Sequence, residues 1–518
     1  MTKAIRFLMC AAVMLVLNAH VALPQALPNL STLRLSYNVR KGTVNPQGEL
    51  KLKIDALDRE LAEATRLGRI GEVRRLLAKG LTLLGGNEWT DVLDFSNSLA
   101  ARADRVFVDP GRPYAVRLEQ IYSPSIALER AVTARASLQT PRAPQPGLAG
   151  VGTAAPVGEL VKDLGAFDEV SRDLRESPLL MELDLSGVAN GAYQIHVDVL
   201  DGDRPLGSAA LGVVVHAGLD AASSRLETEA ARVPEALRAD VLFPADYVRN
   251  VNRGRIARGA FDIAKEIADA EAVVAAAKAG KDPFAARTGD FKRHYLLKAA
   301  GEIMPYRLYV PTTYNPGRPH PLVVALHGLG GTEDSMFGQN YGLVPQAERR
   351  SYIVVAPLGY RVDGGYGVAP GAPANRRAQL SEQDVMEVLQ RVRQQYTIDE
   401  NRIYLMGHSL GAIGTWRLAA NYPNIWAALG PIAGNGNPAT MERMRHIPQI
   451  VVHGDADNVV SVNGSRAMVA ELNKLGGEVK YIEVPGGGHS DIAGPNIPAI
   501  LDFFDTHRKS SPAAVSAR

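Results

Sequence analysis

Cysteine is nearly missing from this chain, since Cys10 is the single one among 518 residues. One cysteine cannot form a disulfide within the chain or supply a cysteine-based zinc site, and its place in an apolar N-terminal run argues against a catalytic thiol. An excess of charge of one sign is also missing, because the formal net charge is +2. No Lys/Arg cluster with interleaved aromatic residues occurs, so we expect no nucleic-acid partner.

Apolar runs of membrane-spanning length are missing as well. The run Phe7–Leu17 is too short for a bilayer, which needs about 20 apolar residues, and no later stretch reaches that length, so we expect no membrane span. Lys3 and Arg6 precede this run and small residues follow it near Ala22, which is typical of an export signal. We expect a cleaved signal peptide over residues 1–22, with a buried first helix as the alternative. An exported chain without disulfides fits a periplasmic or secreted protein.

Apolar residues are otherwise plentiful, at 46% of the chain against 22% charged, which is typical of a globular protein with large cores. At about 150 residues per domain, the length predicts about three domains. From Leu57 to Leu77 apolar residues recur at three- and four-residue spacing, and Gly85 with Gly86 marks a turn. This pattern predicts a helical hairpin over residues 48–104.

The apolar period changes to two over residues 105–217. Ala192–Leu200 alternates between apolar and polar residues, and Asp201–Asp203 has the composition of a turn. We predict a small, immunoglobulin-like β-sandwich here, with a loop at Pro141–Pro156. Residues 218–289 are alanine-rich and are predicted to form a helical linker region.

Strands and helices alternate over residues 290–510. The strands are apolar throughout rather than alternating, which indicates burial on both faces and hence a mostly parallel sheet with helices on both sides. The predicted strands are 321–326, 351–356, 402–406 and 447–452, and the predicted helices are 382–395, 412–421 and 465–475.

The sequence Gly407-His408-Ser409-Leu410-Gly411 matches the pattern G-x-S-x-G. The motif is weak alone, but here it follows a predicted strand and opens a predicted helix, which is the context that a nucleophile elbow requires. The glycines leave room for a strained turn that presents Ser409, and the helix N-terminus favours developing negative charge. Ser409 is therefore the candidate nucleophile.

A serine hydroxyl needs a base and an orienting carboxylate. His489 follows the last predicted strand after three glycines, and we predict that it is the base. Asp455 and Asp457 both follow the strand before that one; Asp457 is preferred because it lies farther along its loop, with Asp455 as the alternative. The backbone N–H groups of Leu329 and Leu410 are predicted to form the oxyanion hole, with Gly330 as the alternative to Leu329.

Three histidines and one loop lie near these positions. We expect His327 and His453, which end strands beside the site, to support loops by hydrogen bonding. Tyr366, in the glycine-rich loop 359–376, and His408 are predicted to bind substrate, although a plain surface crossover accounts equally well for the loop. No metal-ligand spacing or phosphate loop occurs, so we expect no metal and no cofactor.

Residues 290–510, about two fifths of the chain, resemble the α/β-hydrolase superfamily. Arg402–Gly411 and His453-Gly-Asp-Ala-Asp457 are similar to secreted esterases related to polyhydroxybutyrate depolymerases and feruloyl esterases, and equally to predicted peptidases of the prolyl-oligopeptidase and dienelactone-hydrolase type. Many relatives have further glycines after the elbow, where this chain has Ala412-Ile413.

The resemblance implies an exported serine hydrolase that cleaves carboxylic esters through an acyl-enzyme. Its expected partner is a small-molecule or polymer-derived ester. The alternatives are a serine peptidase that uses the same triad and a non-catalytic binding protein on a hydrolase fold.

Overall fold

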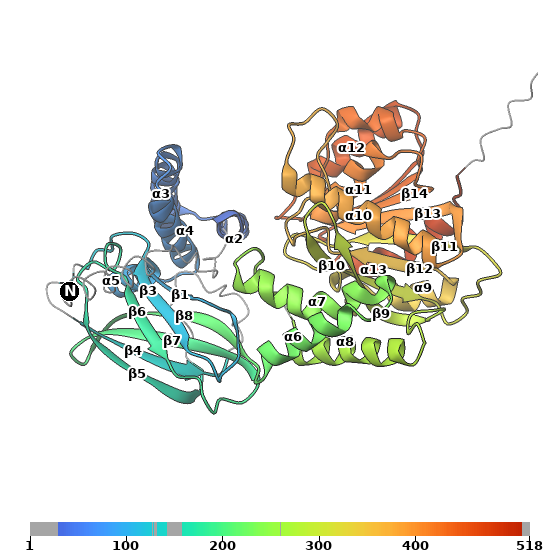
Figure 1. Cartoon of the computed structure of the whole chain (residues 1–518). Coiled ribbons are helices and arrows are strands. Elements are labelled where there is room, and N and C mark those ends of the chain that lie inside the picture. Colours follow the sequence, from blue (N-terminus) through green and yellow to red (C-terminus); the bar gives the residue numbers. More distant parts are fainter. Residues whose placement is uncertain (1–29, 127, 129–131, 142–157, 260, 510–518) are drawn as a thin grey trace, which may run out of the picture. The chain divides into compact units, whose positions relative to one another are not determined.

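The computed structural model describes residues 30–126, 128, 132–141, 158–259 and 261–509 (Figure 1). The predicted signal peptide, and the predicted loop Pro141–Pro156 except its first residue, lie outside these residues. The chain forms two compact units, one of residues 1–225 with 247–267 and one of residues 226–246 with 268–518. Within the described residues, none of the helices combines the length and the apolar character that a membrane crossing requires.

The described part of the first unit opens with the helices α2 (Leu30–Val44), α3 (Gly48–Arg66), α4 (Ile70–Leu84) and α5 (Asp91–Ser98). Apolar residues of α3 and α4, such as Leu57 and Leu77, form one buried cluster with Leu33 and Tyr37 of α2. The predicted turn at Gly85 and Gly86 is confirmed, and α5 follows it. The structure adds a break between α3 and α4 near Gly68, whose φ of +66° is a left-handed conformation that glycine adopts without strain. Gly85 is the residue that ends α4.

Two sheets follow in the same unit. The three-stranded sheet has the order β1-β3-β6 and the five-stranded sheet has the order β2-β8-β7-β4-β5. Inward-facing residues of both sheets share one hydrophobic core. The strands are β1 (Leu99–Ala103), β2 (Phe107–Val108), β3 (Tyr114–Gln120), β4 (Val132–Gln139), β5 (Leu160–Val170), β6 (Leu179–Leu183), β7 (Gly191–Asp201) and β8 (Arg204–Val215).

Three helices come next along the chain, and the division between the two units falls within each of them. They are α6 (Leu219–Ala230), α7 (Glu235–Asn252) and α8 (Ile263–Lys278). In the second unit, Asp240 of α7 accepts a hydrogen bond from the backbone N–H of His294 at 2.8 Å, which fastens this part of α7 to β9 (Gly289–Leu297).

The second unit is built on an eight-stranded sheet with the order β16-β15-β14-β13-β11-β12-β10-β9. From β12 to β16 all neighbouring pairs are parallel, while β10 is antiparallel to both of its neighbours. The mostly parallel sheet agrees with the prediction for residues 290–510, to which the structure adds the hairpin β9–β10. The other strands are β10 (Glu302–Val310), β11 (His320–Leu326), β12 (Ile353–Pro357), β13 (Ile398–His408), β14 (Ala428–Ile432), β15 (Gln449–Gly454) and β16 (Val479–Val484).

Helices cover both faces of this sheet (Figure 1). One core joins α9 (Leu343–Arg350) and α13 (Ala493–Asp505) to alternate strand residues such as Val323 and Val452. The helices α10 (Arg376–Gln395), α11 (Leu410–Asn421) and α12 (Val462–Lys474) contact β12, the β11–β13–β14 group and β15–β16, respectively. Because the parallel strands end at one edge, the loops after β11, β13, β15 and β16 meet there.

Candidate active site

Ser409 occupies a sharp turn between β13 and α11. Its backbone has φ of 58° and ψ of −117°, an unfavourable conformation for a residue with a side chain. The surrounding backbone is packed so closely that a Cβ at Gly407 would clash with Gly411, and a Cβ at Gly411 would clash with the carbonyl oxygen of Leu326. Two glycines are thus required for steric reasons, and the turn holds Ser409 at the end of the sheet.

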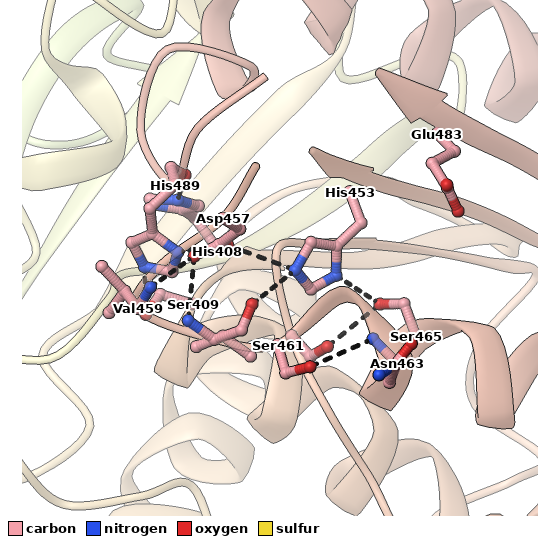
Figure 2. Close-up of polar contacts among 12 residues, drawn as sticks. His408, Ser409, His453, Asp457, Val459, Ser461, Asn463, Ser465, Glu483 and His489 are labelled. Atoms are coloured by element: carbon pink, nitrogen blue, oxygen red, sulfur yellow. Dashed lines mark hydrogen bonds and ion pairs between the residues drawn. The ribbon is translucent and has the colours of Figure 1, made fainter. Parts of the chain in front are cut away.

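The structure brings His489 and Asp457 to this serine (Figure 2). Nε2 of His489 lies 2.9 Å from Oγ of Ser409, and Nδ1 lies 2.7 Å from Oδ2 of Asp457. The side chain of Asp457 is fully buried, whereas that of His489 keeps 14% of its surface exposed. Nδ1–H therefore donates to the carboxylate, and Nε2 is free to accept the proton of the Ser409 hydroxyl.

The carboxylate of Asp457 is held by its own loop. The backbone N–H groups of Val459 and Val460 donate to Oδ1 at 2.8 and 2.9 Å. Burial by itself raises the pKa of Asp457, but the hydrogen bond from His489 and those from Val460 and Val459 outweigh it, so the pKa lies below its ordinary value. The group is therefore ionised near neutral pH.

Asp455, the alternative in the sequence, lies elsewhere. Its Oδ1 accepts a hydrogen bond from the backbone N–H of Gly486 at 2.6 Å, and its residue is exposed. Asp455 therefore ties the loop after β15 to the loop that carries His489, and it does not reach the imidazole that Asp457 contacts.

The turn after β11 carries Leu329 and Gly330, the two residues considered for the second half of the predicted oxyanion hole. A Cβ at Gly328 would come within 3.3 Å of Cβ of Ser409, so this backbone passes directly over the serine. The N–H of Gly330 already donates to the carbonyl of Val362 at 2.8 Å, which disfavours it as an oxyanion donor. Leu410 is the first residue of α11, and an N–H at that position has no acceptor within its helix. This arrangement favours Leu329 over Gly330 as the partner of Leu410.

Buried side chains hold the turn after β11 and its neighbouring loop in place. The ring nitrogens of His327 lie 2.8 Å from the carbonyl oxygen of Gly328 and 2.7 Å from that of Leu358. Burial lowers the pKa of His327. Asp384 of α10 accepts from the N–H of Tyr360 at 2.7 Å, and burial raises its pKa to about 6. The loop after β12 is thus attached both to the turn after β11 and to the interior.

The two residues predicted to bind substrate do not face an open site. Tyr366 is 1% exposed, and its hydroxyl donates to the carbonyl of His327 at 3.0 Å. Its ring fills space that Gly359 and Gly414 leave, since a Cβ at either glycine would collide with it. The substrate role expected for Tyr366 is therefore wrong: it is a packing residue.

His408 is also buried, and its side chain lies behind the base. Tyr341 donates its hydroxyl proton to Nδ1 of His408 at 2.9 Å, and Nε2–H donates to the carbonyl oxygen of His489 at 2.8 Å. Burial lowers the pKa of His408, which keeps the imidazole neutral for this tautomer. The prediction of a substrate contact is wrong here too, because both ring nitrogens are engaged with protein. His408 instead orients the main chain of His489.

Sequence reasoning missed Tyr341 and Asp384, because their partners are 67 and 24 residues away along the chain. His453 was expected only to support a loop. It does so, and it also contacts Asp457, a contact that the closely spaced His453-Gly-Asp-Ala-Asp457 sequence could have indicated. Within the described residues, no group of three or more His, Cys, Asp or Glu side chains is arranged to hold a metal ion.

Comparison with known proteins finds relatives for part of the second unit. Residues 298–477 match the family described as "Putative esterase". The resemblance to esterases is confirmed. The chain is similar to the bifunctional acetylxylan esterase/xylanase XynS20E of Neocallimastix patriciarum, with 27% identity over 33% of this chain, and to the probable feruloyl esterase C of Aspergillus oryzae, with 26% identity over 40% of this chain.

These relatives are matched over different shares of their own length. The match spans 23% of the bifunctional protein, less than a quarter of its length, and 78% of the feruloyl esterase. Among solved structures, a ferulic acid esterase from Anaeromyces mucronatus in complex with ferulic acid aligns over 44% of this chain and 93% of its own, with 20% identity and a TM-score of 0.35. The family match and the curated relatives support a carboxylic-ester hydrolase.

Proposed function

We propose that this protein is a serine hydrolase that cleaves carboxylic esters through an acyl-enzyme. The observation that carries the proposal is the continuous hydrogen-bonded chain from Ser409 Oγ to His489 Nε2 at 2.9 Å and from His489 Nδ1 to the buried Asp457 at 2.7 Å. This order of groups converts a hydroxyl into a nucleophile and returns the proton to a leaving group.

Acylation begins when Oγ of Ser409 attacks the ester carbonyl carbon. The hydroxyl proton passes to Nε2 of His489, and Asp457 stabilises the imidazolium that forms. The carbonyl oxygen becomes an oxyanion, for which the N–H groups of Leu329 and Leu410 are the donors, worth about 3–4 kcal/mol each. The carbon–oxygen bond to the alcohol then breaks, and the alcohol leaves with the proton from His489.

Deacylation uses the same groups in the same order. Water takes the place of the alcohol, gives a proton to His489 and attacks the acyl carbon. Collapse of the second tetrahedral intermediate returns that proton to Oγ of Ser409 and releases the acid. All of these proton transfers use groups of this chain.

Exposed apolar side chains favour an ester with an apolar group. Among the described residues of the second unit, the large aliphatic side chains with strong exposure are Leu296, Leu329, Val362 and Val459. Three of them belong to segments that form the proposed site. Leu329 is in the turn after β11, the carbonyl oxygen of Val362 accepts a hydrogen bond from Gly330 of that turn, and the backbone N–H of Val459 donates to Asp457. Exposed apolar surface next to a nucleophile is suited to binding an apolar acyl or alkyl group.

A p-nitrophenyl ester series from acetate to dodecanoate tests the proposal. We expect turnover by the wild type and its loss in Ser409→Ala. We also expect Val459→Ser to reduce kcat/KM more for longer acyl chains than for acetate. Feruloyl and acetyl esters are natural additions, because the names of the relatives specify these acyl groups. Equal rates for the wild type and Ser409→Ala would contradict the proposal, whichever ester is used.

We also propose that the protein is exported to the periplasm or secreted. The basic residues Lys3 and Arg6 ahead of the apolar run Phe7–Leu17 support this. N-terminal sequencing of the protein recovered outside the cytoplasm tests it. A mature chain that begins after about residue 22 is expected, and a chain retained in the cytoplasm with its first residues intact would contradict it.

A further inference from the structure

A second histidine contacts the carboxylate that orients His489. His453 is the penultimate residue of β15, and its side chain is completely buried. Its Nε2 lies 3.1 Å from Oδ2 of Asp457 and 3.0 Å from the carbonyl oxygen of Val460 (Figure 2). The same Oδ2 accepts the hydrogen bond from His489. Two imidazoles therefore meet at one carboxylate oxygen.

The surroundings of Nε2 determine where its proton lies. A backbone carbonyl oxygen only accepts hydrogen bonds, and an ionised carboxylate does the same. Hydrogen bonds from His489 and from the N–H groups of Val459 and Val460 keep the pKa of Asp457 low, so the carboxylate is ionised. Nε2 of His453 therefore carries a hydrogen and donates it.

The other ring nitrogen has a partner that fits two protonation states. Nδ1 of His453 lies 2.7 Å from Oγ of Ser465 on α12, and that Oγ lies 3.0 Å from the carbonyl oxygen of Gly434. If His453 is neutral, the hydroxyl donates to Nδ1; if His453 is charged, Nδ1–H donates to the hydroxyl, which then donates to Gly434. In both states Nε2–H points to Asp457.

We infer that His453 is a positioning residue of the proposed active site, which holds Oδ2 of Asp457 in line with His489 and limits how strongly that carboxylate raises the basicity of His489. This inference rests on the proposed function. It assigns His453 an effect on catalysis, beyond the support of its own loop, because it donates to the atom that His489 uses. With a hydrogen bond from His453, the negative charge of the carboxylate is shared between two donors, His453 and His489.

The direction of the effect follows from the charges around His453. Asp457 faces Nε2, and Ser465 with the carbonyl of Gly434 faces Nδ1. The nearby titratable side chains are His489, His408 and Glu483, and Glu483 is paired with Arg466 and Tyr481. Loss of the donor, or of a positive charge, at His453 leaves Asp457 more negative toward His489. The imidazolium of His489 is then stabilised more strongly by the carboxylate.

His453→Phe and His453→Gln form a matched pair. Phenylalanine fills the buried space without a donor, whereas the glutamine side chain retains an N–H that can reach Asp457. For His453→Phe we expect kcat to fall about 10- to 100-fold, little change in KM, and an acidic limb of the kcat/KM profile displaced to higher pH. For His453→Gln we expect a smaller fall and an acidic limb at the wild-type position. Ser465→Ala, which removes only the partner of Nδ1, should leave that limb closer to wild type than His453→Phe does.

Separate control measurements distinguish a loss of folding from a failure of the proposed function. Thermal unfolding of each variant identifies any that is not folded. Nitrogen-15 NMR of the histidine-labelled wild-type chain reports the protonation of Nε2 in His453 without any substitution. A protonated Nε2 near neutral pH is expected, and an unprotonated Nε2 would overturn the inference.

A folded His453→Phe with a wild-type pH profile and kcat would also overturn it. If His453→Phe does not fold, His453→Gln and the NMR resonance decide. If the wild type and Ser409→Ala are equally active, the proposed function fails instead. If the wild type is active and the His453 variants keep its kcat and pH profile, this inference is wrong and the proposed function still stands.

Discussion

At the residue scale, the site depends on how the two oxygens of Asp457 are divided between partners. Oδ1 accepts the N–H groups of Val459 and Val460, and Oδ2 accepts His489 and His453. Each oxygen therefore has donors only. A side chain with a hydrogen-bond donor at either oxygen position would face two other donors there. The site therefore requires a carboxylate, and another polar side chain does not fit equally well.

Asp457→Asn therefore has a specific expected result. The carbonyl oxygen of the amide takes the place of Oδ1, where two N–H groups require an acceptor, and the NH₂ group then faces Nδ1 of His489. His489 adopts the tautomer with its proton on Nε2 and cannot accept from Ser409. We expect kcat to fall by about 10³–10⁴-fold with a folded protein. Asp455→Asn is the matched control, because its amide oxygen can still accept from Gly486; it should lose less than about tenfold. Steady-state kinetics check both, and equal losses in the two variants would argue against Asp457 as the orienting group.

At the element scale, the strand–turn–helix unit around Ser409 is the part that local sequence predicts best. Continuous apolarity marks β13, and the glycines on either side of the serine mark where α11 can begin, since both signals act within a few residues. The break between α3 and α4 at Gly68 was not predicted, because the apolar spacing continues across it. The burial of Tyr366 was not predicted either, because it depends on Gly359 and Gly414, which approach it only in the fold.

Gly411→Ala tests the close approach within this unit. Its Cβ would meet the carbonyl oxygen of Leu326, which belongs to the backbone of β11 and cannot turn aside. We expect a destabilisation of about 1–3 kcal/mol and a large loss of activity, because the displaced turn carries Ser409. Gly42→Ala is the control: that glycine lies in α2 with open space around it, so alanine should be neutral or stabilise by up to about 1 kcal/mol. Denaturant unfolding and ester turnover measure both effects, and an active, fully stable Gly411→Ala would contradict this packing.

The loop after β12 is expected to respond to pH through Asp384. Its folded pKa of about 6 lies above the ordinary 3.8, so its stabilising contribution is complete below about 3.8 and is lost as pH rises through 6. The loss is on the order of 3 kcal/mol. In Asp384→Asn this dependence should disappear, so the unfolding free energy of the wild type relative to the variant should decline between pH 4 and 6. Asp363, in the loop after β12, pairs with Arg377 near the surface. Asp363→Asn is therefore the control, and it should keep the wild-type slope. Identical slopes for the wild type and Asp384→Asn would refute the assignment.

At the scale of the whole molecule, the site is assembled from segments that are far apart in the chain. The turn proposed to hold the oxyanion lies near residue 329, the proposed nucleophile at 409, the proposed orienting carboxylate at 457 and the proposed base at 489. The parallel sheet brings them together because its strands end at one edge. This gathering could be predicted from the order of strands and motifs. The hydrogen bonds of His408 and His453 behind the site could not, because they depend on side-chain packing between separate loops.

We expect one serine of the intact chain to be activated as a nucleophile. Treatment of the full-length protein with a fluorophosphonate, followed by intact-mass and peptide mass spectrometry, tests it most directly. We expect one adduct per chain at Ser409, no adduct in Ser409→Ala, and a labelling rate that falls sharply in His489→Ala. Labelling at another residue, or equal labelling of the wild type and Ser409→Ala, would show that Ser409 is not the activated nucleophile.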